Sequence, residues 1–264
     1  MHTPRCNHAS GSVLDYAQSA LAQGMREIGI SDHAPMPAGY DPEWRMRREE
    51  LADYCSEVEQ VAGQLRSELT IRLALEADFY PGAEPWLREL SAAHDWDYWI
   101  GSVHYVGDWG FDNPDLLHQW HGREIEQAYC DYFALVAASA ESRLFEIIGH
   151  PDLIKKFGHR PPAGSRKVAQ AEMAMLEAVR DAGCALEISS AGLRKPVGEI
   201  YPHARIIAEA AKLGIPFAYG SDAHAPQEVG HAMHSCQTLL AACGVRDVAS
   251  FCQRQRNMLP IVAF

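Results

Sequence analysis

The strongest constraint on the fold is an alternation between short β-rich runs and helical stretches. Six runs favour strands, and they lie at 26–31, 71–77, 98–105, 144–149, 185–189 and 216–220. Between them, apolar residues recur at spacings of three and four in stretches at 13–23, 48–69, 122–140, 168–182 and 204–213. A β-α-β-α order predicts a parallel sheet covered by helices.

The length and composition fit one large α/β domain. The chain has 264 residues, of which 47% are hydrophobic, and no linker, repeat or low-complexity tract divides it. Parallel barrels of about 250 residues commonly form one domain. We therefore assign a single domain to residues 1–264, and we expect the first few residues to stand for a seventh strand.

Two parallel architectures compete, a closed barrel and a doubly wound open sheet. No GxGxxG or GxxxxGK[ST] follows any run, which weakens the nucleotide-binding forms of the open sheet. Polar residues instead follow almost every run at its C-terminal end: His33, Glu76, His104, His150, Ser189 or Ser190, Asp222 and His224. In a barrel these ends converge on one face, whereas an open sheet spreads them along a line. The pattern favours the barrel.

The same residues have the chemistry of metal ligands. Imidazole and carboxylate suit zinc, iron and manganese. With His2 and His8 near the start of the chain, eight candidates are available, too many for one tetrahedral ion but suitable for two or three divalent ions. Glu76 is the natural bridge, because a carboxylate offers two oxygens. Each residue alone has a structural alternative, such as a helix N-cap for Asp222, but five strand ends bearing such residues together favour metal binding.

Charge and cysteine usage exclude several classes. A net charge of −12 disfavours a nucleic-acid partner but leaves room for a small anionic substrate. The seven cysteines are scattered and contain no CxxC pair, so we expect no disulfides and a cytoplasmic location. Cys6, between His2 and His8, is the cysteine of interest. The sequence contains no run of 18 uncharged apolar residues, so we expect no membrane span.

Six motifs together resemble the polymerase-and-histidinol-phosphatase (PHP) superfamily, and within it the bacterial histidinol-phosphate phosphatases. They are HTPxCxHA, SDHxPMP, EADFxPG, GSVHY, IGHPDLxKKFGHR and GSDAHxPxEVG, which span residues 2 to about 231. The resemblance implies a distorted TIM-like (β/α)7 barrel, its first strand truncated here, with a trinuclear site. One metal would take His2, Glu76 and Asp222, a second His8, His33 and His224, and a third Glu76, His104 and His150.

The resemblance also implies a reaction, the hydrolysis of L-histidinol phosphate in histidine biosynthesis. Phosphate monoesters hydrolyse very slowly, and metal ions help by acidifying water and clamping phosphate oxygens. We expect a metal-bound hydroxide to attack phosphorus, with Glu76, Asp222 and His224 taking part in catalysis. Guanidinium groups match phosphate, so Arg160, Arg194 and Arg45 are candidate phosphate ligands, with ordinary surface charge as the alternative.

The chain departs from the family at its start. The first family motif is His-x-His; His2 aligns with its second histidine, and the first would precede residue 1. A later-than-natural start, a water or the α-amino group of Met1 in the free coordination position, or a weakened relative would each explain this, and we favour the first. The functional alternatives are a phosphatase for another small ester, such as a nucleotide or sugar phosphate, and an inactive metal-binding relative.

Overall fold

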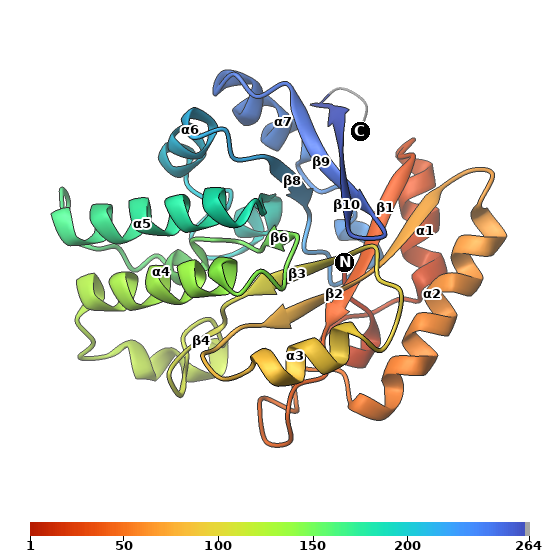
Figure 1. Ribbon diagram of the computed structural model, residues 1–264, viewed down its shortest axis with the longest axis horizontal. Helices are drawn as coiled ribbons and strands as arrows, with labels where there is room; N and C mark the ends of the chain where they lie inside the picture. Colours follow the sequence, from red (N-terminus) through yellow and green to blue (C-terminus); the bar gives the residue numbers. More distant parts are fainter. Residues whose placement is uncertain (262–264) are drawn as a thin grey trace.

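Six parallel strands form one curled sheet at the centre of the computed structural model, which describes residues 1–261 (Figure 1). The strands are β1 (Glu27–His33), β2 (Thr70–Asp78), β3 (Tyr98–Ser102), β6 (Ile147–Ile148), β7 (Ala185–Ser189) and β8 (Phe217–Gly220). They lie in the order β1-β2-β3-β6-β7-β8, so each strand pairs with the next of the expected runs. The predicted α/β fold with a parallel sheet is confirmed.

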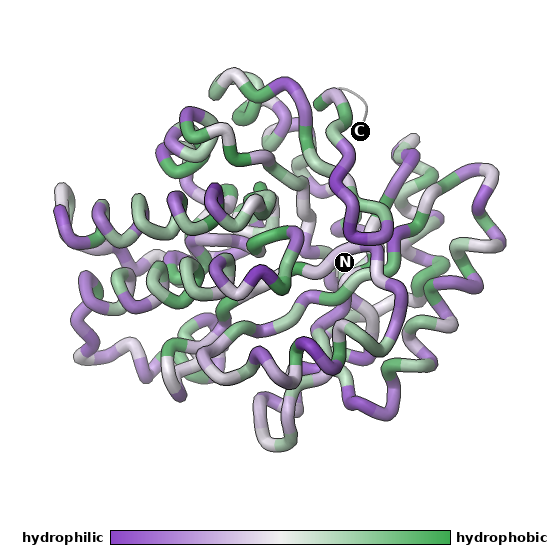
Figure 2. Tube along the Cα trace, in the orientation of Figure 1, coloured by the Kyte–Doolittle hydropathy of each residue, from purple (hydrophilic) through white to green (hydrophobic). Residues whose placement is uncertain are grey.

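The helices surround this sheet. They are α1 (Val13–Ala22), α2 (Leu51–Leu65), α3 (Glu84–Ser91), α4 (Ile125–Glu141), α5 (Arg166–Ala182), α6 (Ala204–Lys212) and α7 (Met233–Ala242). Hydrophilic and hydrophobic segments alternate along them, as expected of helices with one face on a core (Figure 2). Local chemistry sets their ends: Ser12 and Asp15 form a capping box at α1, and Gly183 closes α5 with a φ of 77°. Among residues 1–261, no helix combines the length and apolarity needed to cross a membrane.

Short antiparallel strands and 3-10 helices lie outside the parallel sheet. Two-stranded antiparallel pairs are formed by β4 (Tyr105–Val106) with β5 (Trp109–Gly110) and by β9 (Asp247–Cys252) with β10 (Gln255–Pro260). The 3-10 helices within residues 1–260 are η1 (Pro4–Cys6), η2 (Arg48–Glu50), η3 (Pro114–Trp120), η4 (Leu153–Lys155), η5 (Ser190–Arg194) and η6 (Pro226–Glu228). The run at 98–105 therefore divides after Ser102, and His104 lies in the connection between β3 and β4.

The first two residues lie between the two ends of the sheet, β1 and β8. The backbone N–H of Ser31 in β1 donates to the carbonyl of Met1 at 2.8 Å, and the N–H of His2 donates to the carbonyl of Ala223, just after β8, at 2.9 Å. Met1 and His2 thus stand where the sequence places a short seventh strand. They join the ends of the sheet only at the side where the strands terminate.

The C-terminal hairpin β9–β10 covers the other side of the sheet. Ala249 and Phe251 of β9 pack with Ile100, Ile147 and Ala218 from the parallel strands in a small buried cluster. Arg254, in the turn of the hairpin, donates to the Glu146 carboxylate at 2.9 Å and to the Leu144 carbonyl at 2.6 Å. The hairpin therefore supplies apolar packing beneath the end of the sheet where the polar residues gather.

Close packing inside the sheet predicts a sharp stability effect at Gly101. A Cβ atom added there would overlap the ring of Phe145, which is buried at 4% exposure. We expect Gly101→Ala to lower the free energy of unfolding by about 1–3 kcal/mol, because the ring must move within a packed core. Urea denaturation of the metal-loaded chain measures this.

The matched control is Gly63→Ala in α2, where an added Cβ meets no atom within 4 Å. That substitution should raise the free energy of unfolding by about 0.5–1 kcal/mol, because alanine is the better helix former. Equal effects of the two substitutions would contradict the packing explanation.

Candidate metal centre

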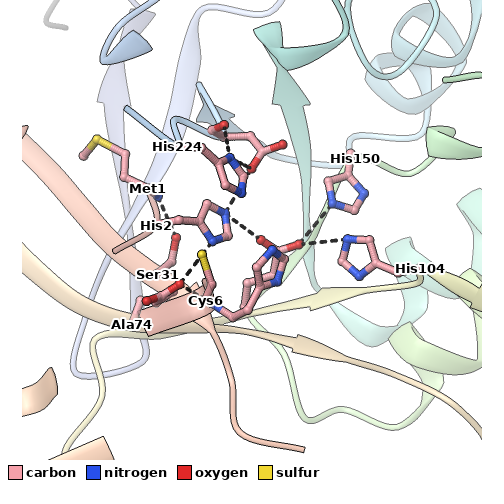
Figure 3. Close-up of polar contacts among 12 residues, drawn as sticks. Met1, His2, Cys6, Ser31, Ala74, His104, His150 and His224 are labelled. Carbon is pink, nitrogen blue, oxygen red and sulfur yellow. Dashed lines mark hydrogen bonds and ion pairs between the residues drawn. The ribbon is translucent and has the colours of Figure 1, made fainter. Parts of the chain in front are cut away.

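The eight predicted ligands gather at one end of the sheet. Figure 3 labels four of them, His2, His104, His150 and His224. His33 ends β1 and is paired in register with Glu76 of β2. The others follow strands or the N-terminal segment: His2 before η1, His8 after η1, His104 after β3, His150 after β6, and Asp222 and His224 after β8. Parallel strands end on the same side, so residues far apart in the chain meet there.

Glu76 lies between two groups of imidazoles. Its Oε1 atom is 3.0 Å from Nε2 of His150 and 3.6 Å from Nε2 of His104, while its Oε2 atom is 3.2 Å from Nε2 of His2. The same His2 nitrogen is 3.0 Å from Oδ1 of Asp222. Two compact groups with the spacing of metal ligands result, Glu76–His104–His150 and His2–Glu76–Asp222. Glu76 belongs to both, as a bridging carboxylate would.

The remaining histidines lie beside these groups. The ring of His8 is 5.3 Å from that of His33 and 4.6 Å from that of His224. His33 and His224 form a ligand-spaced group with His2, and His8 and His224 form another with Cys6. Cys6 is also grouped with His2 and Asp32. The signal for Cys6 in the sequence is its place between two histidines; Asp32 directly precedes His33.

Hydrogen bonds orient several of the imidazoles. Nδ1 of His8 lies 2.8 Å from the Cys6 carbonyl, and Nδ1 of His224 lies 3.0 Å from the Asp222 carbonyl. A carbonyl accepts only, so each Nδ1 carries the proton and each Nε2 keeps its lone pair for a metal. Nε2 of His224 is buried and has no hydrogen-bond partner in residues 1–261. A buried nitrogen with a free lone pair and no protein partner is what a metal ligand would present.

Asp78 and Arg45 orient His104. Nδ1 of His104 contacts the Asp78 carboxylate, which also accepts from Nε of Arg45 at 2.6 Å. Asp78 is 1% exposed and Arg45 is 5% exposed, so this ion pair is fully buried. A carboxylate behind a ligating histidine fixes the ring and raises its basicity. Sequence reasoning treated neither residue as an orienting group.

The three predicted phosphate ligands have different surroundings. The buried Arg45 guanidinium is paired with Asp78, and its Nη1 lies 3.4 Å from Asp41. Arg194, at the end of η5, donates to the carbonyls of Ser221 at 2.8 Å and Asp222 at 3.0 Å. Arg160, after η4, is 42% exposed and pairs with Glu199 at 2.6 Å. Arg194 therefore lies directly against the backbone of the centre.

The electrostatics suit cation binding. Burial raises the pKa of Glu76 and Asp222, but neighbouring histidines outweigh it and hold both well below the usual range. Burial lowers the pKa of His33 and His224 well below the usual value, with the nearby His2 adding to the effect, and it lowers the pKa of His8 to about 4. These two carboxylates are charged and these three imidazoles are neutral, which are the forms that ligate metals. Burial also lowers the pKa of His2, but hydrogen bonds with Asp222 and Asp32 outweigh burial and raise that pKa well above the usual value.

Two of these residues have unusual backbone conformations. His150 has a φ of 21° and Asp222 a φ of 48°, both in the left-handed region. Non-glycine residues are held there at a cost of order 1–3 kcal/mol, and such residues gather at functional sites. The α-amino group of Met1, an alternative for the free coordination position, donates to Oγ of Ser31 at 3.0 Å.

Comparisons with known proteins point in one direction. A model of the PHP domain matches residues 1–191, and a model described as PHP-associated matches residues 201–254. A relative from Deinococcus radiodurans named "Probable histidinol-phosphatase" is 44% identical over 260 residues, 98% of this chain and 97% of the relative. One from Bacillus subtilis named "Histidinol-phosphatase" is 29% identical over 259 residues, 88% of this chain and 94% of the relative.

A solved structure agrees at the level of the fold. The crystal structure of histidinol phosphate phosphatase from Lactococcus lactis subsp. lactis, complexed with zinc, L-histidinol and phosphate, matches with a TM-score of 0.83 and 18% identity. The match covers 97% of both chains. At this identity the likeness shows the fold, and it extends to nearly the whole length.

Metal binding should release a proton from His150. Burial lowers the pKa of this residue, but its hydrogen bond with Glu76 outweighs burial and raises the pKa to about 9. The proton stabilises the metal-free fold below about pH 6.5, and that contribution is lost as the pH rises through about 9. An imidazole that binds a metal ion is neutral. About one proton should therefore leave His150 for each ion that Glu76, His104 and His150 bind near neutral pH.

Calorimetry of zinc binding to the metal-free chain in two buffers of different ionisation enthalpy counts these protons. His94→Gln is the control, because the polar contacts of His94 are with the Glu59 carboxylate and the Asp95 carbonyl, neither of which belongs to the proposed centre. Its proton count should equal that of the wild type. Zinc binding without net proton release would contradict the protonated state of His150.

Removing the charge of Asp78 should weaken the group that contains His104. We expect Asp78→Asn to lower zinc affinity by about 10–100-fold, as is usual when a carboxylate behind a ligating histidine is lost. Competition with a coloured chelator measures the affinity. Glu59→Gln, a carboxylate change on the surface at 58% exposure, should leave it unchanged. Equal affinity of Asp78→Asn and wild type would exclude the orienting role.

Proposed function

The chain belongs to the PHP domain family, and from that premise we propose that it is a metal-dependent phosphatase that hydrolyses L-histidinol phosphate to L-histidinol and inorganic phosphate. The observation that carries the proposal is the pair of ligand groups that share the Glu76 carboxylate. Its context is 44% identity, over 98% of the chain, to a relative named for this activity.

We propose that the ligands divide among two or three divalent ions. His2, Glu76 and Asp222 would hold one ion, and Glu76, His104 and His150 a second. His8, His33 and His224 are adjacent and would hold a third. Zinc, iron and manganese all suit this mixture of imidazole and carboxylate. When bound, such ions acidify water and neutralise charge on the phosphate oxygens.

The reaction needs one water and leaves the chain unchanged. A bond forms between phosphorus and the water oxygen, and the bond between phosphorus and the histidinol oxygen breaks. The water gives up one proton as it attacks, and the departing oxygen takes up one proton and leaves as the alcohol. The ring of His2 contacts the carboxylates of Glu76 and Asp222 and stacks on the ring of His224. We place Glu76, Asp222 and His224 at the reacting phosphate because they lie together at this point.

Positive charge from the protein would assist binding of the substrate phosphate. We propose Arg194 as the principal phosphate ligand, because its guanidinium already contacts the carbonyl of Asp222 and one of its nitrogens, Nη1, is buried without a hydrogen-bond partner in residues 1–261. Arg160 is more exposed and would act from the rim. Arg45 would contribute mainly by keeping Asp78 charged behind His104.

We further propose that the protein works in the cytoplasm, in a reducing environment. All seven of its cysteines lie in the described part of the chain and all are free. Structural disulfides mark oxidising compartments. Free thiols next to candidate metal ligands, as at Cys6, suit a compartment that keeps them reduced.

A panel of phosphate esters tests the function. With zinc, manganese or iron restored to chelator-treated protein, we expect phosphate release from L-histidinol phosphate with kcat/KM at least about 100-fold above that for a nucleotide or a sugar phosphate. A site that recognises the amine and imidazole of the substrate rejects esters that lack them. Chelator alone should abolish turnover.

Two results would change the conclusion. Comparable kcat/KM on nucleotide, sugar and histidinol phosphates would leave a general phosphatase of the same family. Absence of turnover on every ester, with metal bound and measured, would favour an inactive metal-binding relative. The control is the untreated protein in the same assay, which fixes the activity before metal removal.

A further inference from the structure

A carboxylate outside the proposed ligand set lies beneath the metal centre. Glu187 is in β7, is 6% exposed, and faces a cavity of about 180 Å³ inside the curled sheet. Apolar side chains such as Ile100, Ala218 and Phe251 line the lower part of this cavity, and the centre forms its upper part. Burying a carboxylate in such surroundings is costly unless it makes a specific bond.

The specific bond of Glu187 is to the backbone of a proposed ligand. Its Oε2 atom accepts the N–H of His150 at 2.6 Å. On the other side of the same residue, the carbonyl of His150 accepts from the hydroxyl of Tyr132 at 3.1 Å and from the N–H of Leu153 at 2.9 Å. The backbone of His150 is thus held from both sides.

This double hold coincides with the left-handed conformation of His150, whose φ is 21°. In that conformation Nε2 of the ring lies 3.0 Å from Glu76. A histidine in this region is unusual and persists only where surrounding contacts determine it. The 2.6 Å hydrogen bond from Glu187 supplies one of these contacts, and it is charge-assisted whenever the carboxyl group is ionised.

A glycine makes room for this carboxylate. A Cβ atom on Gly220, in the neighbouring strand β8, would overlap Oε1 of Glu187. The φ angle of Gly220 is not in the left-handed region, so the backbone conformation does not require glycine at this position. Space for Glu187 is the remaining structural reason for a residue without a side chain at this position.

We propose that Glu187 is a positioning residue for metal binding. From the space left by Gly220, it fixes the backbone of His150 so that the imidazole completes a site with Glu76 and His104. This inference rests on the proposed metal centre and adds to it a residue that does not touch the metal or the substrate.

The first test is zinc binding to the full-length chain after metal removal, measured by competition with a coloured chelator. Glu187→Ala should lower the affinity for one zinc ion by about 10–100-fold, the usual effect of losing a group that orients a ligand. Glu187→Gln should retain most of the affinity, because its amide oxygen accepts the same N–H. Wild-type affinity in Glu187→Ala, or an equal loss in both variants, would overturn the proposal.

The second test uses the pair Glu187 and Gly220. Gly220→Ala alone should lower zinc affinity as Glu187→Ala does, since the methyl group displaces the carboxylate. Added to Glu187→Ala, it should cost little more, because the carboxylate is already absent. Fully additive losses would overturn the role of Gly220. Gly63→Ala, which meets no atom within 4 Å, is the control and should leave affinity unchanged.

Two further comparisons separate the possible failures. Wild-type chain that binds no zinc would reject the proposed function, whereas normal zinc binding in wild type and Glu187→Ala alike would reject only this inference. If Glu187→Ala does not fold by circular dichroism, Glu187→Asp withdraws the carboxylate by one methylene and should lower zinc affinity. Wild-type affinity in that folded variant would overturn the proposal.

Discussion

One buried carboxylate, that of Glu76, joins the two halves of the centre. Its two oxygens face imidazoles that come from opposite directions, His104 and His150 on one side and His2 on the other. A charged carboxylate is stable in the interior only with such partners. Without the Glu76 carboxylate, the imidazoles around it would lose the negative charge that they share as a polar partner. Convergence of the strand ends and burial of this charge are therefore mutually dependent.

The N-terminal segment takes part in the same balance. Met1 and His2 connect β1 with Ala223, three residues after β8, through backbone hydrogen bonds, and the ring of His2 contacts both Glu76 and Asp222. Closing the sheet and supplying a candidate ligand are thus one structural event. At the other end of the sheet, the hairpin β9–β10 contributes apolar side chains to a small packed cluster. Between this cluster and the polar centre lies the cavity that Glu187 lines.

The sequence was most informative where local pattern and chemistry agree. The alternation of runs and helices predicted all six parallel strands, and the polar residues at their ends predicted which side chains would meet. It was least informative where a contact depends on the tertiary structure. The strand β10 has mostly exposed side chains, so its pattern carries little hydrophobic signal. Asp78, Arg45 and Glu187 act on proposed ligands from other strands or loops, and nothing in their own neighbourhood along the chain indicates this.

The contact between His2 and Asp222 spans 220 residues of sequence. Contacts of such separation form late in folding, because most of the chain must be ordered before they can be made. During synthesis, at roughly 5–20 residues per second, His2 is made first, and Asp222 is made only after all the strands between them. The group built on His2, Glu76 and Asp222 can therefore exist only after the residues up to Asp222 have been made and folded, and cation binding at this proposed site would be a late step in the life of the newly made protein.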